Sequence, residues 1–212
     1  MEGSILEVFK PGVGPSSSHT MGPMLAARLF AARLDDEGLL PRTASVYARL
    51  YGSLALTGHG HCTDRAVLLG LEGHDPATLD PAAMEPALRR IRSTSRLRLA
   101  GKHEIAFDEP MNLLFLRDQR LPGHSNGMRF AALDEGGDVL LQEEMYSIGG
   151  GAVQRAGEAP AEAEAVLVPY PFEDAASMLG ACRGHGLEIH ELALANECAR
   201  QPQAEVERAL DE

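Results

Sequence analysis

Apolar positions recur at helical spacing in several stretches of the chain, and each such stretch predicts a helix. In the first two thirds of the chain these helices cover residues 23–34, 63–73 and 81–93. Ser18 or Thr20 can cap the first helix, and Thr63 or Asp64 can cap the second. After Pro171 the pattern stays helical, over about 172–184, 188–200 and 202–212.

Runs of β-branched, aromatic and aliphatic residues lie between the first helices and predict strands. These runs cover residues 45–56, 95–107, 112–118, 128–133 and 138–146. The sequence DEGGD at 134–138 is a turn signal that joins the last two runs as a hairpin. Mixed strands and helices followed by helices alone predict an α+β fold, with a mixed sheet, helices on one side of it, and a helical tail.

A change in composition divides the chain. Residues 152–165 follow three glycines and are rich in Ala, Glu and Pro, which is typical of a linker. We therefore expect one domain over residues 1–151, a linker over 152–165 and a helical region over 166–212. The last residues, ERALDE, continue a helical pattern, so the helical region is expected to be the start of a larger domain that this chain lacks.

Composition limits the partners. The 212 residues are 44% hydrophobic and carry a formal net charge of −12. This favours a packed core and argues against binding to nucleic acid or to an anionic membrane. The apolar runs are too short to span a bilayer, and no signal peptide is visible. Three widely spaced cysteines, an odd number, favour a reducing cytoplasm over a disulfide framework.

Polar residues gather just before the first predicted helix, at Ser16, Ser17, Ser18, His19 and Thr20. Backbone N–H groups and the helix dipole at such a position attract a carboxylate or a phosphate. On composition alone, an ordinary N-cap with the remaining hydroxyls in solvent is the favoured explanation of the same residues. The lysine of a phosphate-binding loop is missing, so nucleotide binding is not expected.

Three further clusters lie in glycine-containing loops. His59 and His61, in TGHGHCTD, are candidate bases or metal ligands, although a solvent-exposed turn accounts for them as well. His124 and Asn126, in LPGHSNGM, fit an ordinary hairpin loop on their own. The three glycines of YSIGGG indicate either a flexible loop or a close approach of the backbone to another group.

Taken together and in this order, the motifs resemble the N-terminal part of bacterial iron–sulfur-dependent L-serine dehydratases. They are FKPGVGPSSSHTMGPM, YGSLALTGHGHCTD, GLEGHDPATLD, LPGHSNGM, YSIGGG and VPYPF, and the resemblance runs from about Leu6 to the end. Members of that family continue into a larger helical domain whose cysteines hold a [4Fe–4S] cluster. A cluster needs several thiolates brought together, and Cys62, Cys182 and Cys198 do not match the cluster motifs.

The resemblance implies a lyase that converts L-serine to pyruvate and ammonia by α,β-elimination, without pyridoxal phosphate and with the cluster ligands outside this chain. It makes His61 the general base, with His124 and Asn126 orienting substrate or relaying protons. It assigns substrate binding to Ser16, Ser17, Ser18, His19, Thr20, Thr63 and Asp64. No metal ligand is expected here, and His59 has no assigned role.

The resemblance implies two partners, L-serine and the missing cluster-bearing domain. Edge strands and the missing partner surface add a second copy of the chain, in a homodimer, as a further expectation. Two other classes of protein remain open. Related domains in some phosphoglycerate dehydrogenases are regulatory modules that bind anions, and convergence of His61 and His124 on Ser16–Thr20 would argue against this class. A stand-alone metal protein is disfavoured, because no third ligand is spaced near His59 and His61.

Overall fold

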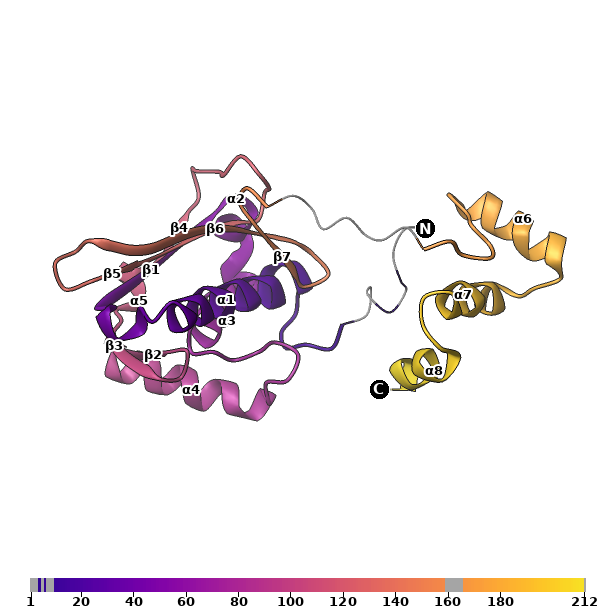
Figure 1. Cartoon of the computed structure of the whole chain (residues 1–212). Helices are drawn as coiled ribbons and strands as arrows, with labels where there is room; N and C mark the ends of the chain where they lie inside the picture. The colour runs from indigo at the N-terminus through magenta and orange to yellow at the C-terminus, as the bar shows by residue number, and fades with distance from the viewer. Residues whose placement is uncertain (1–3, 5, 7–9, 159–165, 212) are drawn as a thin grey trace. The chain divides into compact units, whose positions relative to one another are not determined.

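The computed structural model describes residues 4, 6, 10–158 and 166–211, which divide into two compact units. The larger unit lies within residues 11–158 and contains all the strands that the structure describes. The smaller unit comprises Ser4, Leu6, Lys10 and residues 166–211. The chain is α+β, as predicted (Figure 1).

A five-stranded mixed sheet organises the larger unit, in the order β4–β1–β5–β6–β7. Strand β1 (Ser45–Tyr51) pairs in parallel with β4 (Leu113–Leu116) and antiparallel with β5 (Gly127–Leu133). Strand β6 (Val139–Gly149) pairs antiparallel with β5 and with β7 (Ala152–Arg155). A separate hairpin consists of β2 (Arg96–Leu99) and β3 (His103–Ala106).

Helices α1 (Gly22–Asp36), α3 (Thr63–Leu71) and α4 (Pro81–Thr94) lie on one side of this sheet (Figure 1). Buried and more exposed side chains alternate along β1, which explains why the helices cover one face of the sheet. The buried side chains are those of Val46, Ala48 and Leu50, and the side chains of Tyr47 and Arg49 point to the other face. The α1 side chain Phe30 stacks on Phe130 of β5, with ring centroids 5.4 Å apart. Short helical segments η3 (Leu40–Arg42) and α5 (Glu109–Asn112) complete the unit.

Two of the predicted strands are wrong in extent. The strand expected over 45–56 ends at Tyr51, because Gly52, at φ +54°, turns the chain into the short helix α2 (Gly52–Thr57). The strand expected over 95–107 is the β2–β3 hairpin, which turns at Ala100 and Gly101, both at positive φ. The apolar pattern continues through both turns, so the pattern by itself predicted one long strand in each place.

The predicted helix caps also differ from the structure. Helix α3 has Cys62 at its N-cap position, in the left-handed conformation, rather than Thr63 or Asp64. The first helical segment begins at Ser17, ahead of the predicted start at residue 23, and is capped by Ser16 rather than by Ser18 or Thr20. The helices themselves lie where the apolar periodicity predicts them.

The glycines of YSIGGG form the turn between β6 and β7. Gly149, Gly150 and Gly151 have φ values of +103°, +57° and +75°, which only glycine adopts readily. Strand β7 therefore occupies the beginning of the segment expected to be a linker, and residues 159–165 of that segment lie outside the described part. The expected domain boundary at residue 151 stays a prediction.

The smaller unit contains helices α6 (Ala175–His185), α7 (Ile189–Cys198) and α8 (Gln203–Asp211), close to the three predicted there. Asp174 and Ser177 form a capping box at the start of α6, and Gly186 ends that helix at φ +67°. No helix in the described residues is long and apolar enough to cross a membrane.

Candidate functional site

The serine run forms the first turn of a helical segment that continues as α1. A π-helical turn, η2 (Ser17–Met21), leads directly into α1 at Gly22. The Ser16 hydroxyl accepts a hydrogen bond of 3.1 Å from the backbone N–H of His19, which makes Ser16 the N-cap. The hydroxyl oxygens of Ser16 and Ser18 are 3.5 Å apart, and Ser17 is exposed.

Both ring nitrogens of His19 contact serine hydroxyls. Nδ1 is 2.9 Å from Ser18 Oγ, and Nε2 is 2.9 Å from Ser53 Oγ in the first turn of α2. Burial lowers the pKa of His19 below its ordinary value, the neighbouring His61 lowers it further, and the contact with Ser53 acts in the opposite direction. The lowered pKa therefore favours the neutral form of the His19 ring at pH 7.

The His61 ring lies beside the His19 ring, with centroids 4.9 Å apart. His61 ends the short turn η4 (Gly58–His61), and its Nδ1 is 3.0 Å from the backbone carbonyl oxygen of Thr57. A carbonyl oxygen only accepts hydrogen bonds, so this contact assigns the ring hydrogen to Nδ1. In the neutral ring Nε2 then carries a lone pair, and it has no hydrogen-bond partner among the described residues.

Two buried threonines tie these segments together in a reciprocal way. The Thr20 hydroxyl donates to the backbone carbonyl of His61 at 2.7 Å, and the Thr63 hydroxyl donates to that of His19 at 2.5 Å. Both hydroxyl hydrogens are thus used within the protein. Each threonine fixes the backbone of the histidine on the other segment, which sets the spacing of the two rings.

The loop that carries His124 and Asn126 reaches this cluster through the backbone. The Ser53 N–H donates to the carbonyl of Ser125 at 2.9 Å. The Asn126 N–H donates to Nδ1 of His124 at 3.1 Å, and because an N–H only donates, the hydrogen of the neutral His124 ring lies on Nε2. The buried Asn126 amide donates to the carbonyl of Ser147 at 3.2 Å.

Two other residues of the motifs face elsewhere. Asp64 pairs with Arg92 of α4 at 3.0 Å, and no described contact joins it to His19 or His61. His59 is exposed and stacks on Phe115, with ring centroids 4.0 Å apart. The structure therefore brings together the serine run, His19, Thr20, His61 and Thr63. Asp64 is instead paired with Arg92, and no described contact joins the His124 ring to this group.

Sequence reasoning missed Ser53 and Ser147. Ser53 is part of the motif YGSLALTGHGHCTD. It was predicted to lie in a strand, whereas it lies in the first turn of helix α2. Ser147 is fully buried, and its hydroxyl has no partner among the described atoms. It packs against Gly22, where an added Cβ would lie 2.0 Å from Ser147 Oγ.

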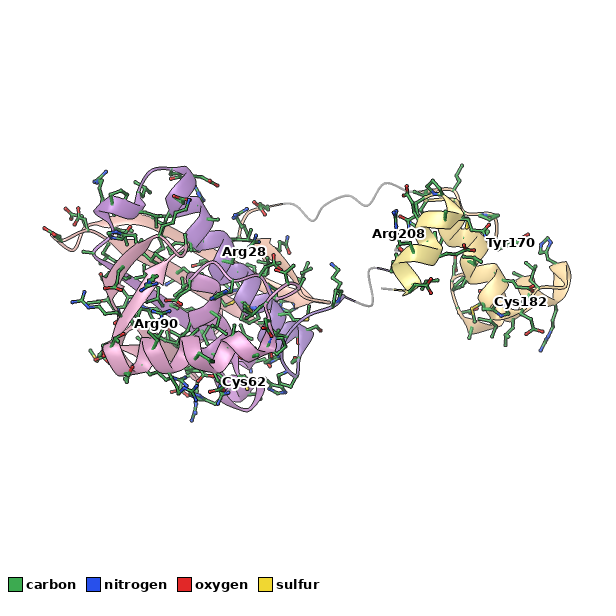
Figure 2. All side chains as sticks on the ribbon, turned by 90° about the horizontal axis from the view of Figure 1, so that it is seen from below. Arg28, Cys62, Arg90, Tyr170, Cys182 and Arg208 are labelled. Atoms are coloured by element: carbon green, nitrogen blue, oxygen red, sulfur yellow. The ribbon has the colours of Figure 1, made fainter. Side chains whose placement is uncertain are left out.

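The cysteines do not fit an iron–sulfur cluster. Cys62 lies on the larger unit, and Cys182 on α6 of the smaller unit (Figure 2). Cys198 is at the end of α7. Within the described part of the chain, no three His, Cys, Asp or Glu side chains converge to hold a metal ion.

Comparison with known proteins gives a consistent result. Residues 4–158 match the family described as the serine dehydratase beta chain. The chain is 43% identical over 210 residues to the L-serine dehydratase of Streptomyces coelicolor, covering 98% of this chain and 46% of that protein. For L-serine dehydratase 1 of Escherichia coli the identity is 40% over 206 residues, with 96% and 45% covered. The chain thus spans less than half the length of these relatives.

Proposed function

Because this chain belongs to the serine dehydratase beta chain family, we propose that it supplies the histidine- and serine-bearing part of an L-serine dehydratase. In this reaction L-serine loses its α-proton and its β-hydroxyl. The resulting aminoacrylate becomes an imine, which is hydrolysed to pyruvate and ammonia. The three free cysteines support a place in the cytoplasm.

The observation that carries the proposal is a pair of backbone contacts, which assign opposite tautomers to the neutral rings of His61 and His124. The Nε2 lone pair of His61 is free to take the α-proton of serine, which is the task of a general base. The Nε2–H of His124 is instead a hydrogen-bond donor that can orient a substrate oxygen. Asn126 holds His124 in this state through its backbone N–H and anchors the loop through its buried side-chain amide.

The serine run is the proposed holder of the substrate carboxylate, the group of serine that does not react. Ser16, Ser17 and Ser18 lie where the helical segment begins, and N–H groups and the helix dipole there favour an anion. Thr20 and Thr63 hold this segment against His61, so a carboxylate bound there would place the substrate beside the base. The ion pair of Asp64 with Arg92 supports a role for Asp64 in fixing the start of α3.

The resemblance implies a [4Fe–4S] cluster, which as a Lewis acid would assist the departure of the β-hydroxyl. The described cysteines do not supply its ligands, so we assign them to the part of the enzyme that this chain does not span and derive no step through the cluster. That part is the proposed partner of this chain. A homodimer stays a prediction.

The approach of His61 to His19 meets one half of the criterion that separates this half-site from a regulatory anion-binding module. No described contact joins the His124 ring to Ser16–Thr20, so the other half stays a prediction. The test is His61→Ala in the intact enzyme, with pyruvate formation from L-serine as the assay. We expect kcat to fall at least about 10²-fold, the usual effect of losing a general base, with little change in serine affinity. His59→Ala is the matched control, because His59 is two residues away and stacks on Phe115. A His61→Ala enzyme with wild-type kcat would remove His61 from the role of base.

A further inference from the structure

Ser53 is held so that its hydroxyl is directed at His19. Its backbone N–H donates to the Ser125 carbonyl, and its own carbonyl accepts a hydrogen bond of 2.9 Å from the Thr57 hydroxyl. With the backbone fixed at both ends, Ser53 Oγ lies 2.9 Å from His19 Nε2. Among the described residues this ring nitrogen is the one acceptor available to the Ser53 hydroxyl hydrogen.

The direction of this hydrogen bond determines what Ser18 presents. A neutral imidazole has one N–H and one acceptor nitrogen. If Ser53 donates to Nε2, then Nδ1 carries the hydrogen and donates to Ser18 Oγ. The Ser18 hydroxyl hydrogen is then released from the ring, with Ser16 Oγ at 3.5 Å as its other described neighbour. In the reverse arrangement Ser18 donates to the ring and presents only lone pairs, which repel an anion.

We propose that Ser53 is a positioning residue: by donating to Nε2 it holds His19 in the Nδ1–H tautomer and thereby frees the Ser18 hydroxyl to donate to a carboxylate. The identity of that carboxylate as the substrate's rests on the proposed function. The direction of the hydrogen bonds is a property of this chain alone. The lowered pKa of His19 supports the proposal, because a protonated ring would donate from both nitrogens.

The tautomer can be measured on the 212-residue chain by ¹⁵N NMR of the histidine rings at pH 7.5. The His19 signals are assigned by their loss in His19→Gln. We expect the Nδ1–H form in the wild type, a shift toward Nε2–H in Ser53→Ala, and the wild-type form in Ser53→Thr, which keeps the hydroxyl. An Nε2–H ring in the wild type, or a ring unchanged in Ser53→Ala, overturns the proposal without any enzyme assay.

The consequence for substrate is measured in the intact enzyme. We expect Ser53→Ala to raise KM for L-serine about tenfold, because a charge-assisted hydrogen bond is lost, and to change kcat less than about threefold. Ser53→Thr should restore KM, which a merely structural defect would not predict. A lower kcat at constant KM overturns the positioning role. If the tautomers are as expected but Ser53→Ala leaves KM unchanged, then Ser18 does not bind the substrate carboxylate. The His61→Ala variant tests the general base separately.

Discussion

Replacing Gly52 by alanine should destabilise the protein more than the same change at Gly38. Both glycines have positive φ, +54° and +67°, a conformation that costs an L-residue about 1–2 kcal/mol. A Cβ added at Gly38 has nothing within 4 Å, whereas at Gly52 it would lie 2.3 Å from the carbonyl oxygen of Ser125. Backbone cannot rotate away as a flexible side chain can, so overpacking at Gly52 adds about 1–3 kcal/mol.

The expected loss in free energy of unfolding is therefore about 1–2 kcal/mol for Gly38→Ala and about 2–5 kcal/mol for Gly52→Ala. In a chain of this size each kcal/mol lowers Tm by about 2–4 °C, so the two variants should differ by about 2–12 °C. Thermal and urea denaturation followed by circular dichroism measure both quantities. Equal losses would show that Gly52 does not approach Ser125 closely, and would weaken the argument that the start of α2 anchors the His124 loop.

Three further predictions concern the chain itself. The lowered pKa of His19 means that the native state resists protonation, so its contribution to stability should be fully present above the ordinary pKa of 6.5 and should fall as the pH drops below it. Between pH 8 and pH 5, His19→Gln should therefore lose less Tm than the wild type. An equal loss in the two proteins would contradict the pKa shift. Thr63→Val removes the donor to the His19 carbonyl and should cost about 1–3 kcal/mol of unfolding free energy in urea, against a near-neutral result if that contact is absent. The chain incubated anaerobically with iron and sulfide should stay colourless and form no pyruvate from L-serine, and a brown, active protein would show that the cluster ligands are misplaced.

The helices were predictable because their signals are local. The apolar period lies within the residues of each helix that it defines. The end of β1 was not predictable in the same way, since an apolar run does not distinguish a buried strand from a buried helix. The change at Gly52 depends on distant carbonyls, those of Gln119 and Ser125, which accept from the N–H groups of Gly52 and Ser53.

In the candidate site, too, local features were predictable from the sequence and long-range contacts were not. The motifs indicated that the serine run and the TGHGHCTD turn belong together, but the reciprocal hydrogen bonds of Thr20 and Thr63 became visible only in three dimensions. Ser53 meets His19 across 34 positions of sequence, at the point where β1 passes into α2. Predicting that contact would have required the end of β1, which the apolar pattern concealed.

The three histidines differ in what determines their hydrogen positions. His61 is held by the carbonyl of Thr57, four residues before it, and His124 by the N–H of Asn126, two residues after it. A backbone N–H can only donate and a backbone carbonyl can only accept. A side-chain substitution that leaves these two turns in place therefore cannot reverse the tautomer of His61 or of His124. His19 is held by hydroxyls, which do both. Its hydrogen position therefore depends on side chains, and a substitution at Ser18 or Ser53 can change it while leaving the hydrogen position of His61 as it is.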